Sequence, residues 1–151
     1  MVDFEKLKQL REKTGISFTL CKKALEEADN DMDKANKVLE KIAGQKIEEK
    51  LKKTTKSGGV FSYVHHNGQV ASFIELLCET DFVAENNDFK ELGHEIALQI
   101  ASSKPKTIKD LLKQEYVKDS KKKISDLINE SVLKFGEKIK ISRLAVWNLG
   151  E

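Results

Sequence analysis

The sequence has a single proline, only two cysteines and no long apolar run. One proline excludes a proline-rich linker, and Cys21 and Cys78, which lie far apart, exclude a disulfide scaffold and suit a reducing compartment. Because no run of about 18 apolar residues occurs, we expect no membrane-spanning helix. The N-terminal stretch lacks the apolar region of a signal peptide, and its early acids, Asp3 and Glu5, are untypical of a transit peptide. We therefore expect a soluble, cytoplasmic protein without a membrane partner.

Motifs of enzyme chemistry are also missing. No GxxxxGK[ST], GxGxxG or GxSxG pattern occurs, which excludes the usual phosphate-binding loops and nucleophile elbows. Glu79 and Asp81 would share a face if their strand continued, but no base or nucleophile accompanies them. His65 and His66 are adjacent on a predicted strand, so we expect them to point to opposite faces and not to share a metal. Cys78 has no ligand-like spacing to either histidine. We expect no cofactor, no metal and no covalent catalysis.

Charge is unevenly distributed, although the net charge is only +2. Residues 75–95 contain seven acids against one lysine, whereas residues 104–143 contain twelve bases against six acids. This asymmetry suggests a charged partner surface. The lysine runs at 50–56 and 121–123 could contact nucleic acid, but they have little aromatic interleaving and no known fold signature. A solvated surface is the favoured interpretation, so we expect no direct nucleic-acid binding.

The N-terminal residues 1–42 are predicted to form a three-helix module. Gly15 should end the first helix, while Ser17 and Asp31 should cap the starts of the second and third. Cys21 lies in an apolar stripe and should be buried. The lysine-rich residues 43–57 are then expected to form a helical or partly frayed linker. The other residues expected to point inward are Phe4, Leu7, Leu10, Leu20, Ala24, Leu25, Ala28, Met32, Ala35, Val38, Leu39 and Ile42.

The segment "VFSYVHHNGQVASFIELLC" predicts a β-hairpin. Asn67-Gly68 favours a two-residue type I′ turn, in which both positions need a positive φ. That turn pairs His65 with Val70 and Tyr63 with Ser72. Both faces are apolar enough to need cover, from helices or from a second copy of the chain. One face would carry Phe61, Tyr63, Val70, Ile74 and Leu76, and the other Val64, Ala71, Phe73 and Leu77.

Helices and one further strand complete the core domain, which we expect over residues 58–151. "DFKELGHEIALQIAS" predicts a helix with an Asp88–Glu91 capping box, ending before Pro105. "KKISDLINESVLKFG" predicts a helix that ends at Gly136, and "KIKISRLAVWNL" predicts a third strand beside the hairpin. "LLKQEYVKD" is ambiguous. The predicted fold class is α+β, with a small three-stranded antiparallel sheet and helices.

Two stretches resemble a known family. "LKQLREKTGISFTLCKKALEEADNDMDKANKVL" is similar to the N-terminal module of elongation factor Ts. "HHNGQVASFIELLCETDFVAENNDFKELGHEIALQIASSKP" is similar to the start of its core domain. The second stretch contains the family's Thr-Asp-Phe-Val signature at Thr80, Asp81, Phe82 and Val83. The last predicted helix and strand also resemble the family, so the resemblance covers nearly the whole chain.

The resemblance implies a guanine-nucleotide exchange factor that binds elongation factor Tu in its GDP-bound and nucleotide-free forms. Thr80–Val83 would act near the partner's Mg²⁺ and help to dislodge it. The N-terminal module, which resembles a ubiquitin-associated domain, would dock on the partner's nucleotide-binding domain. A single copy of the core implies a homodimer through the core domain. The docking residues implied by the resemblance are Arg11, Thr14, Gly15, Lys22 and Lys23.

The residues alone favour a different role for the signature. Without the resemblance, Phe82 would be a core residue at a strand–helix corner and Asp81 a local cap. Three departures from the family pattern stand out: residues 16–19 are not small or Met-rich, Glu85 replaces a common basic residue, and the segment after Pro105 is shortened. Two alternative functions stay open: a ubiquitin-associated-type adaptor without exchange activity, and a lysine-rich nucleic-acid-binding module.

Overall fold

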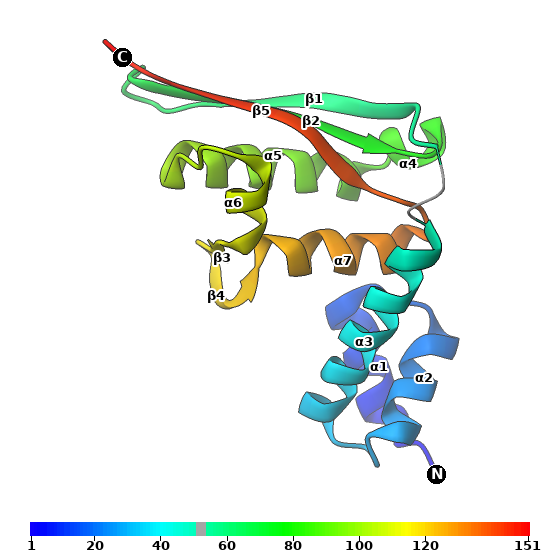
Figure 1. The fold of residues 1–151 in the computed structure, drawn as a ribbon. Helices are drawn as coiled ribbons and strands as arrows, with labels where there is room; N and C mark the ends of the chain where they lie inside the picture. The colour runs from blue at the N-terminus through cyan, green and yellow to red at the C-terminus, as the bar shows by residue number, and fades with distance from the viewer. Residues whose placement is uncertain (51–53) are drawn as a thin grey trace. The chain divides into compact units, whose positions relative to one another are not determined.

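The computed structural model describes residues 1–50 and 54–151 (Figure 1). Residues 51–53, which fall in the expected linker, lie outside the described residues. The chain forms two compact units. The first comprises Met1–Lys52 and Asn129–Gly136, and the second comprises Lys53–Ile128 and Glu137–Glu151. None of the described helices is long and apolar enough to cross a membrane.

The first unit contains three consecutive helices, as predicted. Ser17 accepts a hydrogen bond from the Leu20 N–H, and Asp31 accepts one from the Lys34 N–H, so both predicted N-caps are confirmed. Gly15 ends the first helix with a φ of 69°, a conformation that glycine adopts without strain. The helices are α1 (Phe4–Thr14), α2 (Phe18–Glu27) and α3 (Met32–Lys50).

The apolar stripes of these helices meet in a small core that includes Cys21, which is fully buried as expected. One expected core residue is wrong, because Phe4 is 74% exposed. Phe4 is the first residue of α1, and helical side chains lean towards the N-terminus, so this side chain projects past the helix end. Helix α3 also continues to Lys50, so residues 43–50 of the expected linker are helical. The core residues are Leu7, Leu10, Ile16, Cys21, Ala24, Leu25, Ala28, Ala35, Leu39, Ala43 and Leu133.

The second unit contains a three-stranded antiparallel sheet with strand order β1-β2-β5 (Figure 1). The third strand therefore pairs with the hairpin, as predicted. The ambiguous "LLKQEYVKD" segment forms a short helix followed by part of a two-stranded hairpin. The elements are β1 (Ser57–Val64), β2 (Val70–Cys78), α4 (Asp81–Ala84), α5 (Asn87–Ser103), α6 (Ile108–Lys113), β3 (Glu115–Tyr116), β4 (Asp119–Lys123), α7 (Ile124–Phe135) and β5 (Lys140–Asn148).

The predicted hairpin register is confirmed, but the predicted turn type is wrong. The ladder pairs Tyr63 with Ser72, and the His65 N–H donates to the Val70 carbonyl. Gly68 alone in this turn has a positive φ, 70°, and its N–H donates to the His65 carbonyl, which closes a different turn. The Asn67 side chain accepts a hydrogen bond from the Gln69 N–H, a local contact that competes with the type I′ geometry. Because the loop is still symmetric about Asn67-Gly68, the strand register is unchanged.

The two histidines do not point to opposite faces, so that prediction is also wrong. Their ring centroids are 4.2 Å apart. His66 lies beyond the end of β1, where the strand alternation no longer applies. His65 Nδ1 lies 3.0 Å from the Tyr63 hydroxyl, which gives that ring a local partner. In the described part of the chain, no three His, Cys, Asp or Glu side chains are grouped to hold a metal ion.

Helix α5 starts earlier than predicted. Asn86 is the N-cap and accepts a hydrogen bond from the Asp88 N–H at 2.8 Å, so the Asp88–Glu91 capping box is wrong. Asp88 instead lies in the first turn, where the helix dipole favours a negative charge. Lys104 ends the helix directly before Pro105, as expected. The apolar stripe of Phe89, Leu92, Ile96 and Ile100 is buried.

Helix α5 packs along one face of the sheet (Figure 1). The Ser72 hydroxyl, fully buried in β2, donates to the Ala97 carbonyl of α5. The close approach of helix and sheet depends on Gly93, because a Cβ at that position would lie 2.2 Å from the Phe61 ring. The opposite face is open within the described residues: Val60, Val64 and Trp147 are 67%, 62% and 67% exposed. Among the described residues, helices therefore cover only one face of the sheet.

Replacing Gly93 with alanine tests this packing. Glycine-to-alanine changes within a helix usually stabilise by about 0.5–1 kcal/mol. At Gly93 the added methyl group would overlap the buried Phe61 ring, so we expect destabilisation of about 1–3 kcal/mol. The matched control is Gly44→Ala, an exposed position of α3 with no atom within 4 Å of the added Cβ. Urea unfolding of both variants measures the difference, and a stabilised Gly93→Ala variant would contradict the packing described.

Candidate functional site

The Thr-Asp-Phe-Val segment forms a protrusion at the end of β2. The strand ends at Cys78, and the four-residue helix α4 begins at Asp81. Val83 points into the unit and is only 9% exposed, whereas Phe82 is 92% exposed. The expectation from the residues alone, that Phe82 is a core residue, is therefore wrong. Burial of Val83 anchors this short helix on the unit and leaves Phe82 directed outward.

Thr80 is the N-cap of this short helix. Its side-chain oxygen accepts a hydrogen bond from the Val83 N–H at 3.4 Å, which satisfies one of the free donors at the helix start. Asp81, expected as the cap, is instead the first helical residue. Its carboxylate accepts a hydrogen bond from the Ser57 hydroxyl at 2.7 Å, which links α4 to the start of β1.

A carboxylate from a distant part of the chain fastens the same segment. Glu137, which follows α7, accepts hydrogen bonds from the N–H groups of Glu79 and Thr80 at 3.1 and 3.0 Å. Its second oxygen accepts the Thr80 hydroxyl at 2.6 Å. In return, the Glu79 carboxylate accepts the N–H of Lys138. Glu137 lies 57 positions from Thr80 in the sequence, and no local pattern links the two, so this contact cannot be predicted from the sequence.

Cys78 lies beneath the segment and is fully buried. Its thiol donates to the Thr80 carbonyl at 3.2 Å. Burial, together with the nearby negative charge of Glu137, raises the pKa of the Cys78 thiol to about 11. Burial also raises the pKa of Cys21. Both thiols are therefore protonated at neutral pH, and neither has the environment of a reactive cysteine.

The expected docking residues of the N-terminal module fall into two groups. Arg11 lines a hollow along α1 together with the exposed Phe4 and Phe18 and with Glu5, Leu7, Lys8 and Glu12. Lys22 and Lys23 are exposed on α2, and Lys22 lies 4.0 Å from Glu26. This group has side chains at the surface that a partner could contact.

Thr14 and Gly15 have local structural roles. The Thr14 hydroxyl donates to the Leu10 carbonyl at 2.7 Å and accepts from the Ile16 N–H at 3.3 Å. Gly15 provides the left-handed residue that ends α1. Both residues therefore shape the turn between α1 and α2, which positions Phe18 at the edge of the hollow.

Known proteins resemble this chain along its whole length. A family model described as "Elongation factor TS" matches residues 79–151, which include the protruding segment, and one described as "Elongation factor Ts, mitochondrial, N-terminal" matches residues 2–46. Elongation factor Ts of Thermotoga sp. strain RQ2 is 36% identical over 193 positions, covering 99% of this chain and 97% of the relative. The chain belongs to the elongation factor Ts family. Its members are translation elongation factors, so the resemblance stated from the sequence is confirmed.

Two further relatives show how this member of the elongation factor Ts family differs in length. The protein of Coprothermobacter proteolyticus is 36% identical over 190 positions, covering 96% of each chain. That of Thermosipho melanesiensis is 32% identical over 196 positions, covering 100% of each chain. Because the present chain has only 151 residues, these alignments include positions of the relatives that it lacks. Between α5 and β3 the structure contains only the six-residue helix α6.

Proposed function

We propose that this chain is a guanine-nucleotide exchange factor for elongation factor Tu. The observation that carries the proposal is the 92% exposure of Phe82 on a segment fixed by burial of Val83 and by hydrogen bonds. A large aromatic side chain left in water is unfavourable unless a partner covers it. Phe82 lies in the signature that, by resemblance, acts near the partner's Mg²⁺. No bond-making groups are required for this activity.

The mechanism uses differential binding. Mg²⁺ and backbone N–H groups hold the phosphates of GDP in a GTPase, so GDP leaves slowly while that arrangement is intact. Phe82 would insert between partner side chains beside the Mg²⁺ site, and its ring has little rotamer entropy to lose. Asp81 would accept hydrogen bonds from partner donors and stabilise the displaced arrangement. An exchange factor of this kind binds the nucleotide-free partner more tightly than the GDP-bound partner.

The N-terminal module supplies affinity in this proposal. The hollow is lined by Phe4 and Phe18 and by charges of both signs: Glu5, Lys8, Arg11 and Glu12. A partner surface that places an apolar side chain on the rings and an acidic residue beside Arg11 would fit there. The exposed Lys22 and Lys23 would strengthen attraction to the same acidic surface. Thr14 and Gly15 would contribute by holding the turn that presents Phe18.

Phe82→Ala is the direct test of the exchange mechanism. Because the side chain is exposed, we expect the free energy of unfolding to change by less than about 0.5 kcal/mol. The rate of GDP release should fall by about 10-fold or more, because an interaction made only in the displaced state is lost. Stopped-flow release of fluorescent GDP from elongation factor Tu measures the rate, with and without this chain.

The matched control for Phe82→Ala is Val117→Ala, which truncates another exposed apolar side chain in the β3–β4 turn and should leave GDP release unchanged. Normal release with Phe82→Ala would contradict the mechanism. An adaptor or a nucleic-acid-binding module would not accelerate GDP release at all, so the unmodified chain separates these alternatives from exchange activity.

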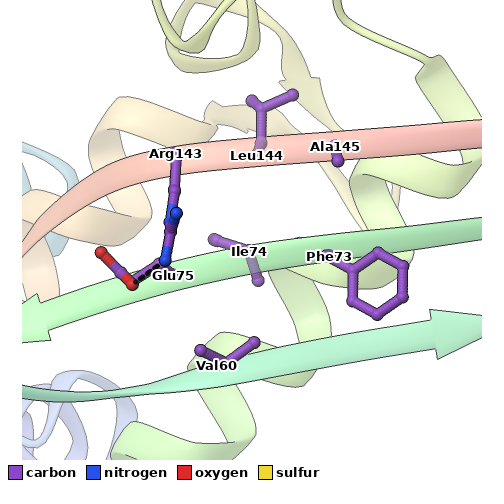
Figure 2. Close-up of a pocket in the computed structure, with 7 residues that line it drawn as sticks. All are labelled: Val60, Phe73, Ile74, Glu75, Arg143, Leu144 and Ala145. Atoms are coloured by element: carbon purple, nitrogen blue, oxygen red, sulfur yellow. Dashed lines mark hydrogen bonds and ion pairs between the residues drawn. The ribbon is translucent and has the colours of Figure 1, made fainter.

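We also propose that the chain is a homodimer through the open face of its sheet. Val60, Val64 and Trp147 are exposed there, and the Trp147 ring lies edge-on to Phe73 at 5.4 Å. Val60 and Phe73 border a hollow whose other side is the Glu75–Arg143 ion pair at 3.0 Å (Figure 2). A second copy related by a two-fold axis would bury both apolar surfaces and face one ion pair with the other.

The Glu75 carboxylate is held in its ionised form in the single chain. Hydrogen bonds from Ser142 and Arg143 lower its pKa, so the ion pair persists at neutral pH. An ion pair beside an apolar patch gives the patch a polar rim, which is typical of protein–protein interfaces. The pair would therefore help to fix the relative orientation of the two copies.

Val60→Asp tests the dimer. The side chain is 67% exposed in the single chain, so the substitution should affect folding little, but it would place two new charges in the dimer interface. We expect light scattering at micromolar concentration to give a dimer mass for the unmodified chain and a monomer mass for this variant. Val117→Asp, at an exposed apolar position outside the sheet, should stay dimeric. A monomeric unmodified chain would refute the dimer.

A further inference from the structure

One carboxylate, that of Glu137, fixes the backbone and the side chain of Thr80, the N-cap of α4. It accepts the N–H groups of Glu79 and Thr80 with one oxygen and the Thr80 hydroxyl with the other. The distances are 3.1, 3.0 and 2.6 Å, all within the range of good hydrogen bonds. Hydrogen bonds to an ionised acceptor are stronger than neutral ones. The reciprocal bond from the Lys138 N–H to Glu79 closes the arrangement.

Helix α4 depends on this support. It has only four residues, far fewer than an isolated helix needs for stability. Phe82 is so exposed that few contacts within the chain hold its side chain. Its direction therefore depends on the residues on either side of it, Thr80 and Val83. Val83 anchors one side by burial. At the other side, the Thr80 hydroxyl both caps the helix and donates to Glu137.

We infer that Glu137 is a positioning residue for nucleotide exchange, which acts by holding Thr80 and thereby the direction of Phe82. This inference rests on the proposed function, in which Phe82 acts as a wedge that inserts between side chains of the partner. Glu137 would hold that wedge in position. Preorganisation of a wedge matters because a displacement of about 1 Å in a functional group can lower a rate by about 100-fold. Glu137 itself would not touch the nucleotide or the Mg²⁺.

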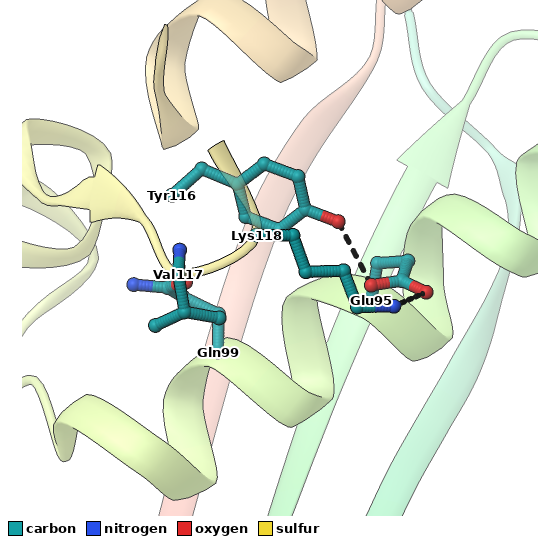
Figure 3. Close-up of polar contacts among 5 residues, drawn as sticks. All are labelled: Glu95, Gln99, Tyr116, Val117 and Lys118. Atoms are coloured by element: carbon teal, nitrogen blue, oxygen red, sulfur yellow. Dashed lines mark hydrogen bonds and ion pairs between the residues drawn. The ribbon is translucent and has the colours of Figure 1, made fainter. Parts of the chain in front are cut away.

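A second carboxylate provides a matched control. Glu95 of α5 accepts hydrogen bonds from the Tyr116 hydroxyl at 2.8 Å and from the Lys118 ammonium at 2.6 Å (Figure 3). It fastens the β3–β4 hairpin, as Glu137 fastens α4, and it also comes from a distant part of the chain. Loss of Glu95 should therefore weaken the fold without changing the direction of Phe82. If a less stable fold by itself slows GDP release, Glu95→Ala should slow it as well.

The test compares Glu137→Ala, Glu95→Ala, Phe82→Ala and the double variant Glu137→Ala/Phe82→Ala in stopped-flow GDP release. With Glu137→Ala we expect the maximal release rate to fall by about 10-fold, because the wedge is misdirected. The concentration of chain that gives half-maximal release should change by less than about 2-fold, because docking is intact. Adding Glu137→Ala to Phe82→Ala should lower the rate by less than about 2-fold further, because both changes remove one function.

Two readouts make the role of Glu137 specific. In the free chain, Glu137→Ala should speed hydrogen exchange of the Glu79 and Thr80 amides, and Glu95→Ala should not. Glu137→Gln keeps an oxygen for those two amides but presents an NH₂ group where the Thr80 hydroxyl donates. Its maximal rate should therefore lie between those of the unmodified chain and Glu137→Ala, even if Glu137→Ala folds poorly.

Several outcomes overturn the inference. The first is a normal maximal rate of GDP release with Glu137→Ala. The second is a fall in that rate no larger than the fall with Glu95→Ala. The third is a double variant whose fall in rate is the product of the falls in the two single variants. If exchange by Phe82→Ala is normal, the proposed wedge fails and the inference fails with it. If Phe82→Ala is slow but Glu137→Ala is not, only the inference about Glu137 fails. A non-additive loss of maximal rate, with faster amide exchange at Glu79 and Thr80, supports it.

Discussion

Strand β2 is held on three sides, and the position of the Thr80–Val83 segment depends on this. It pairs with β1 at one edge and with β5 at the other, and the Phe61 and Ser72 contacts fasten the sheet to α5. A strand restrained in this way ends at a fixed point. The chain leaves that point at Cys78, so the short helix that follows begins from a rigid base. Glu137 then fixes its first turn, and Phe82 is presented outward.

Phe82 and the open sheet face with Val60 and Trp147 are apolar features of the second unit that face solvent in the single chain. Phe82 and the open sheet face are both held by packed elements, so the chain cannot bury them by a small local rearrangement without a cost in free energy. In the proposed account they serve different partners. Phe82 would meet elongation factor Tu, and the sheet face would meet a second copy of the chain. One face of the sheet packs on α5, and the other is open to pair with a second copy of the chain.

The sequence predicted the elements whose signals are local. Alternation of apolar residues and the Asn67-Gly68 spacing gave the hairpin register, whereas the turn type was wrong because the Asn67 side chain formed its own local bond. The exposure of Phe82 contradicted the burial expected of an aromatic residue, since only the family resemblance indicated a partner. Glu137 could not be predicted, because its contact with Thr80 joins residues 57 positions apart in the sequence.

The central claim is that this chain binds elongation factor Tu in a way that opposes binding of GDP. Isothermal titration of the chain against the partner, without nucleotide and with saturating GDP and Mg²⁺, tests it most directly. Because coupling between two ligands is reciprocal, the account predicts tighter binding to the nucleotide-free partner. The ratio of the two affinities must equal the factor by which the chain weakens GDP binding. Equal affinity for both forms of the partner would contradict the account.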